Sequence, residues 1–155
     1  MSSWATLDRR TLVNFAGAVL EVFSAHVQLG DTDREAGGLL LGTVHGSHML
    51  VEQATIPTAL DKRFRHRFER LPFGHSAVAQ SRWLQTGGQV RYLGEWHTHP
   101  EPDPNPSLFD RIEWQRLAAN RNDHRAMLVV IVGRRRLHVE VVSEDGVGAV
   151  LIPIG

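Results

Sequence analysis

The sequence predicts an α/β fold of the α+β type, in which a mixed β-sheet is flanked by about three helices. Residues 126–132 form an uninterrupted apolar run, which is typical of a central strand. Residues 137–142 alternate in polarity, and Leu137, Val139 and Val141 are predicted to face inward. Longer segments with apolar residues at helical spacing lie between the predicted strands. At 155 residues the chain is expected to form one domain, residues 1–155.

The first half of the chain is predicted to contain two helices and two strands. In residues 8–28 the polar positions recur at spacings of three and four, which predicts a largely buried helix. Residues 37–44 and 49–56 are predicted strands joined by a turn over residues 45–48. Residues 57–72 carry few aliphatic and many charged side chains, so we expect them at the surface. A second helix is predicted over residues 75–85, ended by Gly87 and Gly88.

The second half is predicted to contain one more helix and four more strands. A strand over residues 90–99 is followed by a loop with proline at every second position from Pro100 to Pro106, which stiffens it toward polyproline II. A third helix is predicted over residues 107–120. The strands at residues 126–132 and 137–142 and a last strand at residues 147–154 complete the sheet.

Composition excludes several classes of function. The 17 basic and 17 acidic residues balance, so no long-range field favours nucleic acid or an anionic membrane. Cysteine is absent, which excludes disulfides, thiolate metal sites and a cysteine nucleophile. The N-terminal segment lacks the pattern of a signal peptide, and no run of about 18 apolar residues is present to span a bilayer. We therefore expect a cytoplasmic protein without membrane contact.

The stretch GEWHTHPEPDPNPSLFD, from Gly94 to Asp110, is predicted to hold a metal site. On a strand His97 and His99 point to the same side, and the loop is long enough to bring Asp110 back to them. Two histidines and one carboxylate, with a fourth position left to water, are typical of catalytic zinc. Two alternatives are structural: the histidines could be satisfied by hydrogen bonds, and Ser107 with Asp110 could form a capping box.

These residues resemble the JAMM signature of MPN-domain (JAB) metallopeptidases, in which H-x-H, ten residues and D are combined with a Ser three residues before the Asp. The segment EAGGLLLG, which begins at Glu35, also fits the E-x-x-G-x-L-x-G motif of that family. The resemblance implies the MPN/JAB architecture, a curved mixed sheet of the cytidine deaminase-like kind. It implies one Zn²⁺ per chain bound by His97, His99 and Asp110, with Glu35 as general base and Ser107 as donor to the oxyanion. Without the resemblance, Glu35 could be a surface carboxylate paired with Arg34.

Three further side chains are candidates for supporting roles. Glu95 lies on the same strand face as the histidines and could orient a ligand from outside the coordination sphere, or could lie at the surface. Phe64 and Phe68 alternate with a set of arginines, and the resemblance implies that this segment contacts the substrate, because an insertion at a comparable place in members of the family helps to hold the ubiquitin-like partner. A nucleic-acid surface is the less favoured interpretation because the net charge is zero. The arginines of this set are Arg63, Arg65, Arg67 and Arg70.

The chain is most like the bacterial JAB deconjugating proteases of ubiquitin-like and CBASS-type antiphage operons. The resemblance implies a zinc-dependent peptidase or isopeptidase that cleaves after the C-terminal tail of a ubiquitin-like protein, either a precursor or a conjugate. Its expected partners are that protein, its conjugates, and E1-like and E2-like enzymes encoded nearby. Two alternatives stay open: a non-catalytic MPN scaffold subunit, and a DNA-repair-associated JAB relative. Relatives of the second kind usually carry an N-terminal helix-hairpin-helix segment, which is not recognisable here.

Overall fold

The structure is a computed structural model that describes residues 2–58, 61–64, 68–69 and 72–155. The helices within this part of the chain are α1 (Gly17–His26), α2 (Pro72–Gln85) and α3 (Leu108–Ala119). The strands are β1 (Ser2–Thr6), β2 (Leu12–Phe15), β3 (Gly37–His45), β4 (His48–Ala54), β5 (Lys62–Arg63), β6 (Phe68–Glu69), β7 (Arg91–Thr98), β8 (Met127–Val132), β9 (Leu137–Val142) and β10 (Gly148–Pro153).

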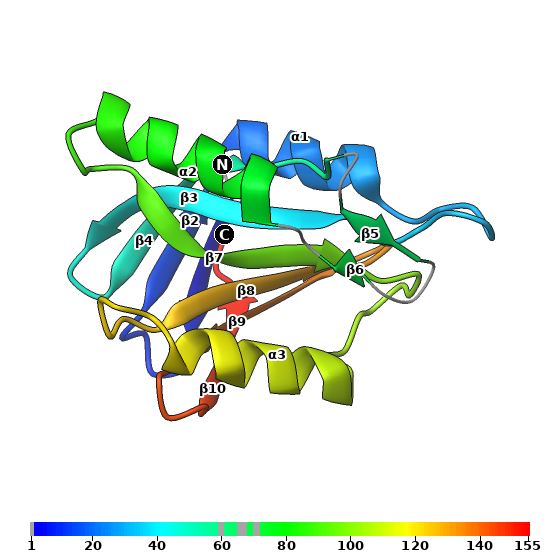
Figure 1. Cartoon of the computed structure of the whole chain (residues 1–155). Coiled ribbons are helices and arrows are strands. Elements are labelled where there is room, and N and C mark those ends of the chain that lie inside the picture. Colours follow the sequence, from blue (N-terminus) through cyan, green and yellow to red (C-terminus); the bar gives the residue numbers. More distant parts are fainter. Residues whose placement is uncertain (1, 59–60, 65–67, 70–71) are drawn as a thin grey trace.

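Eight of the strands form a closed barrel, shown in Figure 1, in the order β1, β10, β9, β8, β7, β3, β4, β2. The pairs β2–β4 and β7–β8 are parallel, and the other neighbours are antiparallel. The α/β fold with a mixed, curved sheet and three helices is therefore confirmed, although closure of the sheet was not predicted. Closure depends on β1, which pairs with both β2 and β10 and so joins the two ends of the chain.

The helix predicted over residues 8–28 is wrong in its first half. Residues Leu12–Phe15 form β2, and the helix begins only at Gly17. Val13 and Phe15 are fully buried while the residues beside them are half-buried, a period of two that the longer helical pattern obscured. Pairing with β1 and β4 satisfies the backbone of β2, and this tertiary pairing overrides the weak local preference for helix.

The barrel interior and the two outer helices determine where β7 is accessible. Trp96 and Leu40 lie in the interior cluster, to which α1 adds Phe23. Helix α3 packs on the outside of β8 and β9 through Trp114, and α2 packs on the outside of β3 and β7 through Val78. Figure 1 shows α2 and α3 on either side of β7. The outward side chains of β7 therefore lie between two helices. None of the described helices is both long and apolar enough to cross a membrane.

The glycines of the EAGGLLLG segment allow β3 to lie close to β4. A Cβ on Gly38 would lie 2.3 Å from the carbonyl oxygen of Thr55, and one on Gly42 would lie 1.9 Å from that of Leu50. Leu40, between them, is completely buried in the barrel. The close packing of β3 therefore explains the glycines of this segment. Because Gly37 pairs with His97, the residues just before β3 lie next to the end of β7.

Candidate metal centre

Strand β7 positions two imidazoles side by side at its carboxyl end. His97 and His99 approach each other to 3.1 Å between their Nε2 atoms, and their ring centroids lie 4.8 Å apart. Thr98 is fully buried on the other side, where its Oγ1 accepts a hydrogen bond from Ala36 N and donates one to Gln28 Oε1. Both hydrogen bonds hold the strand end in register, so the two histidines converge as the alternation of a strand predicts.

Asp110 comes to the same point from the first turn of α3. Its Oδ1 lies 3.3 Å from His97 Nε2, and its Oδ2 lies 3.2 Å from His99 Nε2. The predicted capping box is also present, because Ser107 Oγ accepts from Asp110 N at 3.1 Å and Asp110 Oδ2 accepts from Ser107 N at 2.8 Å. The capping interpretation and the metal interpretation are therefore compatible. The cap fixes the carboxylate that faces the histidines.

The spacing of these donor atoms fits a tetrahedral zinc ion. Zn²⁺ bonds of about 2.0–2.1 Å require ligand atoms roughly 3.3 Å apart in a tetrahedron. The three contacts among His97, His99 and Asp110 range from 3.1 to 3.3 Å, and one donor atom from each residue lies within 4.8 Å of the others. Burial acts to raise the pKa of Asp110, but hydrogen bonds with His97 and His99 hold it well below the ordinary value. The carboxylate is therefore ionised and suited to a cation.

Glu35 is a buried residue of this site, so the interpretation as a surface carboxylate paired with Arg34 is wrong. Only 3% of Glu35 is exposed, and its Oε1 lies 3.6 Å from His99 Nε2. Burial raises the pKa of Glu35 to about 9, and the negative charges of Asp110 and Glu101 act in the same direction. A divalent cation on the neighbouring ligands would oppose this shift, because it favours the ionised carboxylate.

The β5–β6 hairpin contacts Glu35 through the backbone. Arg63 Nε donates to the carbonyl oxygen of Glu35 at 2.9 Å, and Glu35 N donates to the carbonyl oxygen of Phe64 at 2.5 Å. The side chain of Phe64 is 52% exposed, while the ring of Phe68 lies against Gly37. The predicted segment of aromatic residues is therefore adjacent to the site. Of the alternating arginines, Arg65, Arg67 and Arg70 lie outside the described residues.

Other residues near the ligands were predicted only in part. Glu95 lies on the outer face of β7, as expected, and its Oε2 accepts a hydrogen bond from Tyr92 Oη at 2.8 Å. Glu101 was missed: its Oε1 lies 3.2 Å from His99 Nδ1, although without hydrogen-bond alignment. Its position two residues after His99 in HTHPE is the signal that could have identified it. Carboxylates near a ligand histidine commonly orient its ring.

A second cluster lies behind His97 on the α3 side. The Trp114 ring lies 6.2 Å from the His97 ring and stacks on His138, with centroids 6.4 Å apart and an interplanar angle of 8°. Arg111 and His138 both hydrogen-bond the carboxylate of Glu140, which is 2% exposed. We call Arg111, His138 and Glu140 the Glu140 cluster. No sequence pattern pointed to it, because its members come from α3 and β9 and meet only in the fold.

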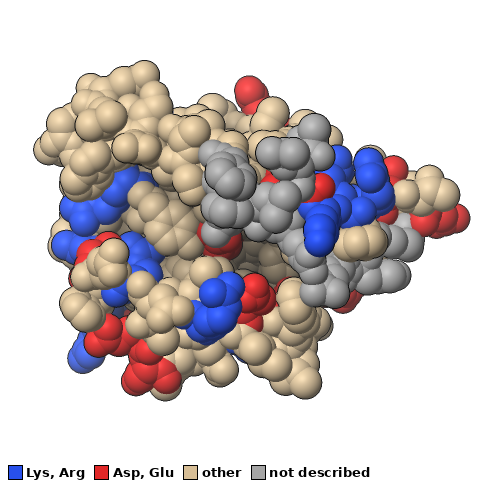
Figure 2. Space-filling view, viewed as in Figure 1, with Lys and Arg blue, Asp and Glu red and all other residues tan. Residues whose placement is uncertain are grey.

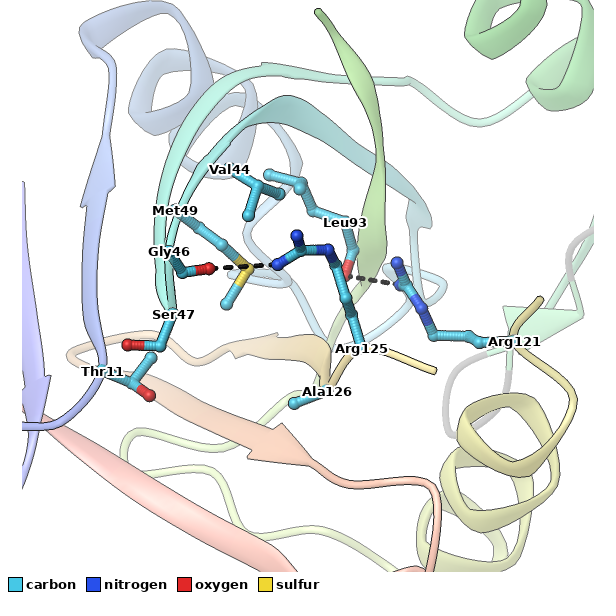
Figure 3. A pocket seen from close by; sticks show the side chains of 9 residues that line it. All are labelled: Thr11, Val44, Gly46, Ser47, Met49, Leu93, Arg121, Arg125 and Ala126. Atoms are coloured by element: carbon cyan, nitrogen blue, oxygen red, sulfur yellow. Dashed lines mark hydrogen bonds between the residues drawn. The ribbon is translucent and has the colours of Figure 1, made fainter. Parts of the chain in front are cut away.

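A pocket of about 350 Å³ lies at the opposite end of the barrel and contains none of the candidate ligands. Figure 3 shows its apolar wall with Met49 and Leu93, and Arg125 reaching across to the carbonyl oxygen of Gly46. The start of β7 contributes to this pocket, whereas the metal candidates follow the end of β7. Figure 2 shows basic and acidic residues interspersed on the face that carries β7 and α3, in agreement with the balanced net charge.

Comparisons with known proteins agree with this arrangement. The model of the family described as "Prokaryotic homologs of the JAB domain" matches residues 17–143. A Pseudomonas aeruginosa protein named CD-NTase/cGAS isopeptidase is 60% identical over 154 residues, which cover 99% of this chain and 98% of that protein. A Vibrio cholerae protein of the same name is 36% identical over 80% of this chain and 78% of its own length. A solution structure from Desulfitobacterium hafniense matches with a TM-score of 0.62 over 92% of this chain and 89% of that one; at 20% identity it shows similarity of fold.

Proposed function

Because this chain belongs to the family of prokaryotic JAB-domain homologues, we propose that it is a zinc-dependent isopeptidase that removes a protein tail from a conjugate. One observation carries the proposal: the ring nitrogens of His97 and His99 and the carboxylate oxygens of Asp110 approach one another to 3.1–3.3 Å beside the buried Glu35 carboxylate. The membership confirms the predicted resemblance to JAB proteins. The scaffold alternative requires lost ligands, whereas the residues of the motif are all present and converge.

The proposed chemistry assigns a separate task to each residue. A bound Zn²⁺ would polarise the scissile carbonyl and lower the pKa of water toward neutrality. Glu35 borders the ligand cluster and takes the proton from the attacking water. It then gives the proton to the departing lysine amine, so that one carboxylate serves as base and then as acid. Its burial excludes bulk water from this proton transfer.

Ser107 is proposed to stabilise the oxyanion of the tetrahedral intermediate. Its Oγ accepts from the backbone N–H of Asp110, and this bond fixes the oxygen while leaving its own hydrogen to donate. The same serine caps α3, so a rigid helix end supports the donor. Replacing it with alanine removes both the donor and the cap, whereas threonine keeps both.

The substrate proposal uses the shape of the site and the names of the relatives. The ligands come from the end of β7, the residue after it and the first turn of α3, and we expect a metal held there to act on an extended tail rather than on a folded segment. The relatives' name, CD-NTase/cGAS isopeptidase, makes conjugates of a CD-NTase the first substrate to test. The tail of a ubiquitin-like protein, expected from the sequence resemblance, is the second. In both cases the exposed Phe64 and the hairpin that carries it would contact the folded body behind the tail.

The proposal is tested with two substrates that differ only in the bond. The C-terminal peptide of a CD-NTase is joined to the ε-amine of a reporter lysine in one and to an α-amine in the other. We expect cleavage of the isopeptide, inhibition by a chelator and recovery with Zn²⁺. A parallel fusion to a ubiquitin-like tail identifies which tail is preferred. Equal cleavage of all three substrates and of an unrelated flexible peptide would identify a general peptidase and refute the proposal.

Two variants separate metal binding from proton transfer. The His97→Ala/His99→Ala protein should lose its zinc, as measured by metal analysis. Glu35→Gln should retain zinc and lose about 10²–10⁴-fold in turnover, which is the contribution of a general base. Glu144→Gln is the matched control, because Glu144 lies in an exposed ion pair with His124. Full activity of Glu35→Gln would place the base elsewhere and make Glu95 the next candidate.

A further inference from the structure

A chain of three polar side chains is buried behind the hairpin that contacts Glu35. His75, in the first turns of α2, is completely buried, and its Nδ1 lies 2.6 Å from Thr55 Oγ1. Its Nε2 lies 2.6 Å from Asp61 Oδ2, and the side chains of both residues in this pair have no exposed surface. Such a buried network persists only when its hydrogen bonds are satisfied, because each unpaired member costs about 1–3 kcal/mol.

Both ends of this hydrogen-bonded series are also bonded to the backbone. The N–H of Leu39 donates to Thr55 Oγ1 at 2.7 Å, and the same hydroxyl shares a hydrogen bond with His75 Nδ1. The other ring nitrogen, Nε2, donates to the carboxylate of Asp61, which accepts when ionised. Asp61 Oδ2 also accepts from the N–H of Thr58 at 2.8 Å. Strand β3 is thereby connected through His75 to the residue that precedes the hairpin.

The residue types could suggest a second catalytic site, since a hydroxyl, an imidazole and a carboxylate follow one another. Burial excludes that interpretation: Thr55 is 5% exposed, His75 is not exposed, and the Asp61 side chain is likewise covered. No substrate carbonyl can reach the hydroxyl without unfolding this region. The hydrogen-bonded series Thr55–His75–Asp61 is therefore structural, and its role depends on which segment it holds in place.

What it holds is the hairpin beside Glu35. Strand β5 follows Asp61 directly, and the next residues bond the Glu35 backbone on both sides, through Arg63 Nε and the Phe64 carbonyl oxygen. The Thr58 side chain packs on Gly74 beside His75, where an added Cβ would lie 2.7 Å from Thr58 Cγ2. Figure 1 shows β5 and β6 beside the end of β7, at a distance from most of α2.

We propose that Asp61, His75 and Thr55 are positioning residues that fix the β5–β6 hairpin on the backbone of Glu35 and so place the Glu35 carboxylate beside the metal ligands. The catalytic consequence rests on the proposed role of Glu35 as general base. The structural consequence does not: loss of the anchor frees the hairpin and weakens the hydrogen bond from Glu35 N to Phe64 O. Misplacement of a base by as little as about 1 Å lowers turnover markedly.

The test compares Asp61→Ala with Asp61→Asn in the full chain loaded with zinc. Asparagine keeps an oxygen that can accept from His75 and Thr58, so it is the conservative variant expected to rescue most of the effect. The main readout is amide hydrogen exchange at Glu35, whose N–H bonds the hairpin, relative to Thr98, whose N–H bonds Ala36 O and does not involve the hairpin. In Asp61→Ala we expect about tenfold faster exchange at Glu35 and a change below about twofold at Thr98.

Two further measurements complete the experiment. Zinc content should be unchanged in both Asp61 variants, and kcat for the isopeptide substrate should fall at least tenfold in Asp61→Ala and much less in Asp61→Asn. His75→Leu tests the middle residue of the Thr55–His75–Asp61 series in the same way. Unchanged exchange at Glu35 in Asp61→Ala and His75→Leu would refute the anchor, and equally faster exchange at Thr98 would show only general destabilisation and refute it too. Because exchange needs no substrate, an inactive wild-type protein would refute the proposed function and leave the anchor tested.

Discussion

Replacing Thr98 with valine should destabilise the protein strongly, although the two side chains have nearly the same shape. The Thr98 hydroxyl is completely buried, accepts from Ala36 N at 2.9 Å and donates to Gln28 Oε1 at 2.8 Å. Valine removes the partner of a buried backbone N–H, which costs about 1–3 kcal/mol, and a second hydrogen bond worth roughly 0.5–1.5 kcal/mol. The gain from the added methyl group is below about 1 kcal/mol. We therefore expect the free energy of unfolding to fall by about 1–4 kcal/mol, or a loss of roughly 2–16 °C in Tm for a chain of this length.

Urea unfolding followed by circular dichroism measures this loss, with Thr98→Ser as the matched control. Serine keeps both hydrogen bonds and removes one buried methyl group, so it should cost about 1 kcal/mol. The prediction is therefore an order: wild type, then Thr98→Ser, then Thr98→Val. If the two variants were equally destabilised, the hydroxyl would contribute nothing beyond its volume, and the account of how the end of β7 is held against residue 36 would be wrong.

Three other outcomes are expected. Zinc at about 100 times its Kd should stabilise the wild type by about 2.7 kcal/mol and leave the variant without the two ligand histidines unaffected, as a thermal melt with and without metal would reveal. Burial acts to raise the pKa of Glu140, but the hydrogen bonds of the Glu140 cluster hold this pKa below its ordinary value of 4.5. The resulting stabilisation is present above pH 4.5 and is lost as the pH falls below it, so urea titrations should show Glu140→Gln less stable than wild type at pH 7 and the gap narrowing in acid. Gly94→Ala should prevent β7 from pairing with β8, because the new Cβ would lie 1.6 Å from the carbonyl oxygen of Leu128, whereas Gly17→Ala, with no atom within 4 Å of its Cβ, should fold normally on size-exclusion chromatography and circular dichroism.

The sequence by itself determined the features that depend on local spacing. Alternation on a strand put His97 and His99 on one side, and the ten residues to Asp110 were enough for a return to them. The same local chemistry produced the capping box that Ser107 and Asp110 form. Most strands and helices were also predicted within a few residues, since their apolar patterns belong to single elements.

Only the tertiary structure decided the features that join distant segments. Residues 8–28 have helical spacing, but β2 forms there because β1 and β4 offer hydrogen-bonding partners on both sides. The surroundings of Glu35 likewise come from separate segments: His99, which follows β7, Asp110 at the start of α3, and the β5–β6 hairpin. The buried chain from Thr55 through His75 to Asp61 had no signal in the sequence, because each residue alone is common in loops and helices. Their shared burial gives them a role, and burial is a property of the packed fold.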